Sequence, residues 1–185
     1  MSAVERILAE RFVAVIRRAP DLDAVAEELV EAGIGVLEFT LDSPGALAAI
    51  ARWRGRATVL AGTVRTEVEA AAAVEAGAEA LVSPVLDPEL VRKEHTVPFV
   101  PGCFTASEIE EAWRLGAPLV KLFPAGALGP GYVRSLLAPL ADVPLLVTGG
   151  ITADNALDFL AAGAVAVGAD SSRAVAVWER VRVAR

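Results

Sequence analysis

The chain alternates short runs of apolar, often β-branched residues with segments in which apolar residues recur at helical spacing. The apolar runs are nearly continuous, as expected for parallel strands whose outer face is covered by helices. We expect strands at Phe12–Arg17, Gly35–Thr40, Thr58–Ala61, Ala80–Ser83, Pro98–Pro101, Leu119–Phe123, Pro144–Thr148 and Val165–Gly168. We expect helices at Leu22–Ala32, Ala46–Trp53, Glu67–Ala76, Pro88–Lys93, Ser107–Leu115, Tyr132–Leu137, Asp154–Ala162 and Arg173–Arg182.

Eight strand–helix pairs in one chain of 185 residues predict an α/β protein, folded as a compact (β/α)8 TIM barrel. An open, doubly wound sheet is the alternative, but no Gly-x-Gly-x-x-Gly segment follows the first predicted strand. No linker or low-complexity segment divides the chain. We therefore expect residues 1–185 to form a single domain.

Composition narrows the class of protein further. The net charge is −7 and no basic cluster is present, which argues against nucleic-acid binding. No apolar run approaches the roughly 20 residues of a membrane-spanning helix, and the first residues lack the pattern of a signal peptide. The single Cys103 cannot form an internal disulfide, so we expect a cytoplasmic protein and a small buried thiol. The single His95, expected to be a solvated loop residue, cannot build a histidine metal site.

The two lysines differ sharply in their surroundings, in a chain that has 15 arginines. Lys93 has charged neighbours, whereas Lys121 lies inside the apolar run Pro118–Pro124. Arginine stays protonated in proteins, but a buried lysine amine can lose its proton and attack a carbonyl carbon. Lys121 is therefore a candidate for covalent chemistry. The alternative is a lysine at a strand end whose ammonium group reaches water.

Catalytic groups of a barrel gather at the carboxyl ends of its strands. Glu38 lies within an apolar strand, and a buried carboxylate needs a partner, for which Lys121 is available. Such a pair is either structural or a pair for proton transfer. After the seventh predicted strand, Gly149 and Gly150 expose backbone N–H groups where many barrels bind phosphate.

Six segments occur in the order and spacing of a known enzyme family, across nearly the whole chain. They are Val36–Leu41, Ala61–Val64, Val82–Pro84, Val100–Gly102, Val120–Ala125 and Thr148–Ile151. On these segments the chain resembles the 2-keto-3-deoxy-6-phosphogluconate (KDPG) / 4-hydroxy-2-oxoglutarate (KHG) aldolases. These are class I aldolases, which form a Schiff base on a small barrel.

The resemblance implies a role for each matching residue. Lys121 would form the Schiff base, and Glu38 would be the general acid/base. The residues implied in substrate binding are Thr63 and Thr148 for the pyruvyl part, Pro84 and Phe123 for the pocket wall, and Gly149, Gly150 and Ser171 for a distal phosphate. Because a protonated imine is itself a good electron sink, no metal or cofactor is expected. The resemblance also implies a homotrimer.

Three positions depart from the family pattern. Asp42 stands where the family often has an arginine that holds the substrate carboxylate, so we expect Arg17, or less directly Arg65, to supply that charge. Asp170 follows the eighth predicted strand, where an acid would repel a phosphate. Gly126 stands where many members have a glutamate. These departures concern the phosphorylated end of the substrate and not the lysine–glutamate chemistry.

The first hypothesis is therefore an aldolase that cleaves 2-dehydro-3-deoxy-6-phosphogluconate to pyruvate and glyceraldehyde 3-phosphate. The close alternatives are 4-hydroxy-2-oxoglutarate, which gives pyruvate and glyoxylate, and an unphosphorylated 2-keto-3-deoxy acid. A hypothesis of another class is a diverged trimeric barrel with weak or no catalysis. A phosphate-binding isomerase barrel is also possible, but it would not need Lys121.

Overall fold

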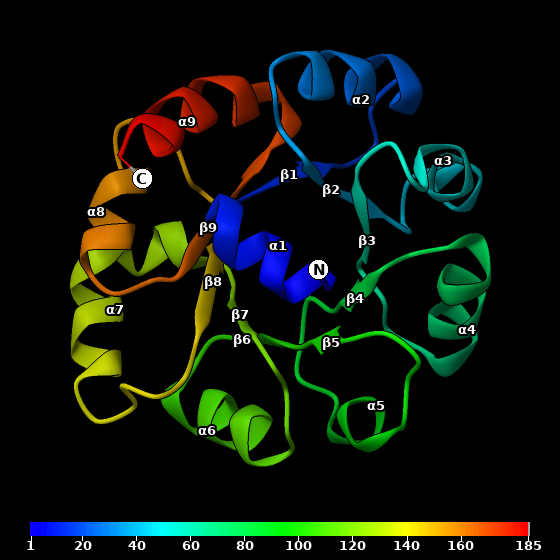
Figure 1. Ribbon diagram of the computed structural model, residues 1–185. Helices are drawn as coiled ribbons and strands as arrows, with labels where there is room; N and C mark the ends of the chain where they lie inside the picture. Colours follow the sequence, from blue (N-terminus) through cyan, green and yellow to red (C-terminus); the bar gives the residue numbers. More distant parts are fainter. Residues whose placement is uncertain (185) are drawn as a thin grey trace.

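Parallel strands form a barrel surrounded by helices in the computed structural model, which describes residues 1–184 (Figure 1). The strands are β1 Phe12–Ile16, β2 Val36–Thr40, β3 Thr58–Gly62, β4 Ala80–Val82, β5 Phe99–Val100, β6 Gly102–Cys103, β7 Val120–Leu122, β8 Leu145–Thr148 and β9 Ala166–Asp170. The helices are α1 Ala3–Glu10, α2 Leu22–Glu31, α3 Ala46–Trp53, α4 Glu67–Ala76, α5 Pro88–Arg92, α6 Ala106–Arg114, the 3-10 turn η1 Ala125–Ala127, α7 Gly129–Leu137, α8 Ala156–Ala161 and α9 Ser171–Val183. The expected (β/α)8 barrel is confirmed.

The fifth expected strand, Pro98–Pro101, forms as β5, and a second short strand that was not expected, β6, follows it. The strand order is β5-β4-β3-β2-β1-β9-β8-β7-β6, so the two ends of the sheet are β5 and β6. Only Pro101 separates these two strands along the chain, which brings the ring close to closure. Proline has no N–H to donate, which interrupts the ladder, although the Pro101 carbonyl still accepts from the Lys121 N–H at 2.9 Å.

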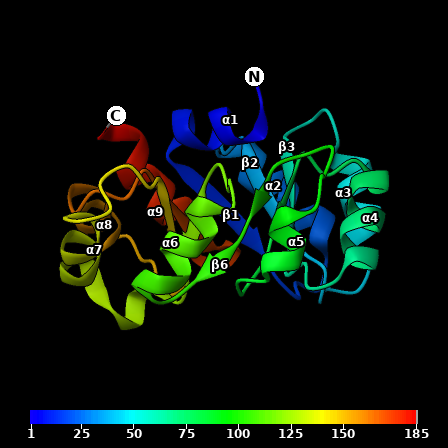
Figure 2. The same ribbon diagram turned by 90° about the horizontal axis from the view of Figure 1, so that it is seen from below.

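Helix α1, which the repeat of strands and helices did not predict, covers one end of the barrel. Ser2 and Glu5 form a capping box at its start. Ala3 and Ile7 pack against strand residues of the barrel interior, and Ile7 is fully buried. Figure 1 shows α1 in front of the barrel axis, and Figure 2 shows it at one end of the barrel. The opposite end, where the strands finish, is left for the site.

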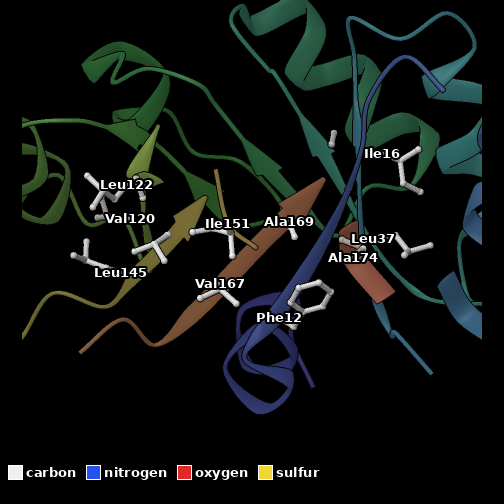
Figure 3. Close-up of a cluster of buried hydrophobic side chains, with 14 of the residues drawn as sticks. Phe12, Ile16, Leu37, Val120, Leu122, Leu145, Ile151, Val167, Ala169 and Ala174 are labelled. Atoms are coloured by element: carbon white, nitrogen blue, oxygen red, sulfur yellow. The ribbon is translucent and has the colours of Figure 1, made fainter. Parts of the chain in front are cut away.

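Strand side chains alternate between the barrel interior and the layer of helices. On β7, Val120 and Leu122 belong to the cluster beneath the helices (Figure 3). Lys121 lies between them in the strand and therefore faces inward. On β2, Leu37 belongs to the same outer cluster, whereas Val36 packs in the interior. Glu38 therefore shares the inward face with Val36.

Candidate active site

Lys121 and Glu38 meet inside the barrel. Lys121 Nζ lies 3.3 Å from Glu38 Oε1, and the two residues are 5 % and 0 % exposed. In the sheet order, four steps separate β2 from β7, so the two strands lie across the barrel from each other. The contact therefore spans the interior and depends on the whole ring of strands.

Two buried polar atoms, one in the middle of β2 and one at the end of β8, have unused hydrogen-bonding capacity. Neither Glu38 Oε2 nor Thr148 Oγ1 has a hydrogen-bond partner within residues 1–184. A buried polar atom without a partner is costly, so such atoms mark places where a ligand or water completes the bonding. Glu38 can thus hold Lys121 with one oxygen while the other remains free for a substrate.

A cavity of about 130 Å³ reaches Lys121 at the carboxyl ends of the strands. The expected site residues that line it with Lys121 are Arg17, Phe123, Thr148, Gly149 and Gly150; the others are Val15, Ile151, Gly168, Asp170 and Arg173. Lys121 Nζ lies 5.6 Å from the centre of the Phe123 ring, which supplies an apolar wall beside the amine. The structure thus brings together most of the residues that the sequence indicated.

Arg17 is held at the mouth of this cavity by neighbouring strand ends. Its Nη2 donates to Thr63 Oγ1 at 3.0 Å, and its Nε lies 3.8 Å from Asp42 Oδ1. Asp42 also pairs with Arg18 at 3.1 Å. Asp42 thus holds the guanidinium groups of Arg17 and Arg18 near the position where the family pattern has an arginine. Of these two, Arg17 lines the cavity and can bind a substrate carboxylate.

Two of the expected site residues, Pro84 and Ser171, border other hollows, and Arg65, the alternative to Arg17, lies outside the Lys121 cavity. Pro84 borders a neighbouring hollow of about 400 Å³, which shares Phe123 with the Lys121 cavity. Ser171 borders another hollow, of about 620 Å³, which shares Arg17 and Asp170 with that cavity. Arg65 is exposed, directly before the N-cap residue Thr66 of α4, and does not line the Lys121 cavity.

The loops after β7 and β8 touch through glycines. The Gly126 N–H donates to the Gly149 carbonyl at 2.7 Å. A Cβ on Gly126 would lie 2.8 Å from Gly150 Cα, which is closer than packing allows. Gly126, which departs from the family pattern, is thus required by this close contact between the loops.

Arg173 was not among the residues expected at the site, and the hydrogen bonds that Asp170 accepts were not expected either. Strand β9 ends at Asp170 and α9 begins at Ser171, so no loop separates them. Asp170 Oδ1 accepts from the Ser172 backbone N–H at 3.0 Å and from its hydroxyl at 2.7 Å. This cap on α9 brings Arg173, in the first helical turn, to the Lys121 cavity. The signal in the sequence was an acid followed by serines directly after the last apolar run.

Cys103 and His95 have structural surroundings. Burial, together with the Glu108 and Glu111 carboxylates, raises the pKa of the Cys103 thiol to about 12, as expected for an unreactive buried residue. His95 lies in a loop, as expected, but it is only partly exposed: its Nε2 lies 2.8 Å from the Leu90 carbonyl and its ring stacks on Phe99. Within residues 1–184 no three His, Cys, Asp or Glu residues group to hold a metal ion. No helix in this part of the chain is long and apolar enough to cross a membrane.

An inward lysine paired with a carboxylate, at the carboxyl ends of the strands of a parallel barrel, defines an enzyme of the aldolase class. Comparison with known families agrees: the profile described as KDPG and KHG aldolase matches residues 4–179. The chain belongs to this family.

Named relatives share both sequence and structure with the chain. The 2-dehydro-3-deoxy-phosphogluconate aldolase of Treponema pallidum is 39 % identical over 155 residues, which cover 80 % of this chain and 74 % of the relative. KDPG aldolase of Legionella pneumophila, solved with pyruvate as a covalent carbinolamine, is 27 % identical with a TM-score of 0.83, over 100 % and 92 % of the two chains. The Zymomonas mobilis enzyme, solved with 3-phosphoglycerate, is 28 % identical with a TM-score of 0.83, over 96 % and 94 %.

Proposed function

We propose that this chain is a class I aldolase that cleaves 2-dehydro-3-deoxy-6-phosphogluconate to pyruvate and glyceraldehyde 3-phosphate. The observation that carries the proposal is the buried contact of 3.3 Å between Lys121 Nζ and Glu38 Oε1. A buried ion pair contributes little stability for its cost, so its presence at the cavity favours a catalytic use. The aldolases of Treponema, Legionella and Zymomonas support the choice of substrate.

The reaction begins at the ketone of the substrate. Glu38 accepts a proton from Lys121, and the neutral amine adds to C2 to form a carbinolamine. Glu38 gives this proton to the carbinolamine hydroxyl, which leaves as water; the product is a protonated imine, and Glu38 is again a carboxylate. Glu38 then removes the proton of the C4 hydroxyl, the C3–C4 bond breaks, and its electron pair moves to the imine as an enamine. The C4 oxygen becomes the aldehyde of glyceraldehyde 3-phosphate.

The second half of the reaction releases pyruvate. Glu38 returns a proton to C3 of the enamine, and water hydrolyses the resulting imine to pyruvate and the free Lys121 amine. Glu38 Oε2, buried and without a partner in residues 1–184, is the oxygen available for these transfers. One carboxyl group thus serves both half-reactions.

Residues that line the Lys121 cavity or lie beside it hold the substrate. Arg17 binds the carboxylate at C1, while the Thr63 and Thr148 hydroxyls contact the pyruvyl part. Phe123 and Pro84 form the apolar wall. The distal, phosphorylated end of the substrate lies toward Gly149 and Gly150. The hollow at Ser171, which shares Arg17 with the Lys121 cavity, lies on the same side.

A comparison of the two lysines tests the proposal. Lys121→Ala abolishes pyruvate release from 2-dehydro-3-deoxy-6-phosphogluconate, whereas Lys93→Ala leaves it unchanged, because Lys93 pairs with Glu67 on the surface. Circular dichroism of both variants checks the fold. The same assay with 4-hydroxy-2-oxoglutarate tests the alternative substrate. Pyruvate release by Lys121→Ala at the wild-type rate would contradict the proposal.

We also propose a cytoplasmic homotrimer, as the family resemblance implies. An apolar surface between α3 and α4 supports a subunit contact: Val68 is 79 % exposed and Leu47 is 41 % exposed, beside a hollow of about 570 Å³. Native mass spectrometry of Val68→Asp, with Val183→Asp as an equally exposed control, tests this contact. A trimer that persists in Val68→Asp would contradict this interface.

A further inference from the structure

We propose that Arg173 binds the distal phosphate of the substrate and sets the preference for phosphorylated substrates. This inference rests on the proposed aldolase function and goes beyond the residues that the family resemblance implies. Arg173 lines the same cavity as Lys121, Gly149 and Gly150. A guanidinium group presents a planar pair of N–H donors that matches phosphate oxygens.

The charges around this cavity leave Arg173 available. Lys121 is paired with Glu38 at 3.3 Å, and Arg17, directly after β1, donates to Thr63, directly after β3. Arg173 makes no hydrogen bond and no ion pair within residues 1–184. Of the three cations that line the cavity, Arg173 is therefore the one whose charge is not already engaged by another side chain.

The place of Arg173 on its helix also points to a ligand. Arg173 lies in the first turn of the 13-residue helix α9, where the helix dipole disfavours a cation. The acid at the helix start, the N-cap residue Asp170, is hydrogen-bonded to Ser172 and makes no ion pair with Arg173 within residues 1–184. A bound anion at the cavity could therefore pair with the Arg173 guanidinium, and it would also be attracted by the positive end of the helix.

Asp170 makes the start of α9 a poor phosphate site without an additional positive charge. Its Oδ1 already accepts from the Ser172 backbone N–H and hydroxyl, so those donors are not free for a phosphate. Its negative charge also weakens the attraction of the helix start for an anion. Arg173 adds a positive charge to the lining of this cavity, and the glycine loop after β8 supplies further backbone N–H groups there.

Binding of 3-phosphoglycerate tests the inference without requiring catalysis. Calorimetric titration compares the wild type with Arg173→Ala and with Arg180→Ala, a matched control on the same helix that does not line the cavity. We expect Arg173→Ala to weaken binding about ten- to one-hundred-fold, because it removes a charge-assisted bidentate contact, and Arg180→Ala to leave it within about two-fold. Arg173→Lys, which keeps the charge but not the planar fork, should fall between them.

Kinetics separates this inference from the proposed function. Arg173→Ala should raise KM for the phosphorylated substrate by a similar factor and leave kcat/KM for 2-dehydro-3-deoxygluconate, which lacks the phosphate, unchanged. Undetectable binding of 3-phosphoglycerate by the wild type, or equal binding by Arg173→Ala, would overturn the inference. A wild-type protein that binds the probe through Arg173 but cleaves no substrate would support the inference and refute the proposed function.

Discussion

The carboxyl group of Glu38 occupies the space where Gly62 has no side chain. A Cβ added to Gly62 would lie 2.3 Å from Glu38 Oε1, the oxygen that contacts Lys121. The two residues belong to neighbouring strands, with Thr40 of β2 paired to Gly62 of β3. Glycine is required at this position for space, so that the carboxyl can reach across the barrel.

Gly62→Ala should therefore move Glu38 away from Lys121. We expect kcat for aldol cleavage to fall about 100-fold, because proton transfer depends on the position of the carboxyl group, while KM changes little. The pH profile of kcat should change shape as well. Gly131→Ala is the matched control, since a Cβ there meets nothing within 4 Å. An equal loss in both variants would contradict a positioning role for Gly62.

The buried pair can be tested by a double-mutant cycle in urea unfolding. Lys121→Met leaves Glu38 without its partner, and Glu38→Leu leaves Lys121 without its own, so each should lower the free energy of unfolding by about 3 kcal/mol. The double variant should recover most of that loss while remaining inactive, because no unpaired charge is left in the interior. Strictly additive losses would show that the two groups do not interact as the 3.3 Å contact indicates.

Arg17 should act on substrate binding more than on the chemical steps. Arg17→Ala is expected to raise KM about 10- to 100-fold, because it removes a charged contact to the substrate carboxylate. Arg18→Ala is the control, since Arg18 pairs with the same Asp42 but does not line the cavity. Steady-state kinetics with both variants checks this expectation. A larger rise in KM from Arg18→Ala than from Arg17→Ala would contradict the assignment of the substrate carboxylate to Arg17.

Much of the barrel could be predicted because buried parallel strands appear as apolar runs. The pairing of Glu38 with Lys121 could be expected because each is an ionisable residue inside a buried apolar strand and needs a partner of opposite charge. Helix α1 was missed because it precedes the first strand–helix pair, although the capping-box spacing of Ser2 and Glu5 was present. Strand β6 was missed because Gly102–Cys103 is too short to form an apolar run, whereas the interruption at Pro101 follows from the N–H that proline lacks.

The substrate-binding residues could be predicted only in part. The pattern placed Arg17 and Thr148 at strand ends, where they do line the cavity. Arg173 could not be distinguished from other arginines of helical segments, because its position depends on α9 beginning directly after β9. Pro84 and Ser171 border neighbouring hollows, and which hollow a side chain borders depends on packing that no spacing in the sequence records.

Asp23 gives a pH-dependent contribution to stability. The hydrogen bond from Arg52 outweighs the opposing effect of burial and, with that from Trp53, holds the Asp23 pKa below its ordinary value of 3.8. A lowered folded-state pKa means that the stabilisation is complete above pH 3.8 and is lost as the pH falls through the folded-state pKa. Asp23→Asn should therefore be less stable at pH 7 by no more than about 1 kcal/mol, since both charged groups are half exposed.

Thermal unfolding of wild type and Asp23→Asn across this range checks the expectation. The difference in stability between them should be constant near neutral pH and should close in acid, once the Asp23 carboxylate is protonated. A difference that stays the same from pH 7 to the acid limit of the folded protein would contradict the account, because it would not arise from the charge of Asp23.

Reductive trapping with pyruvate and borohydride tests the central claim most directly. The chain has only two lysine side chains, so peptide mapping by mass spectrometry can distinguish Lys121 from Lys93 without ambiguity. The account predicts a reduced pyruvyl adduct on the peptide that contains Lys121, present in Lys93→Ala and absent from Lys121→Ala. An adduct on Lys93 or on the amino terminus alone, or no adduct at all, would contradict the claim that Lys121 is the Schiff-base residue.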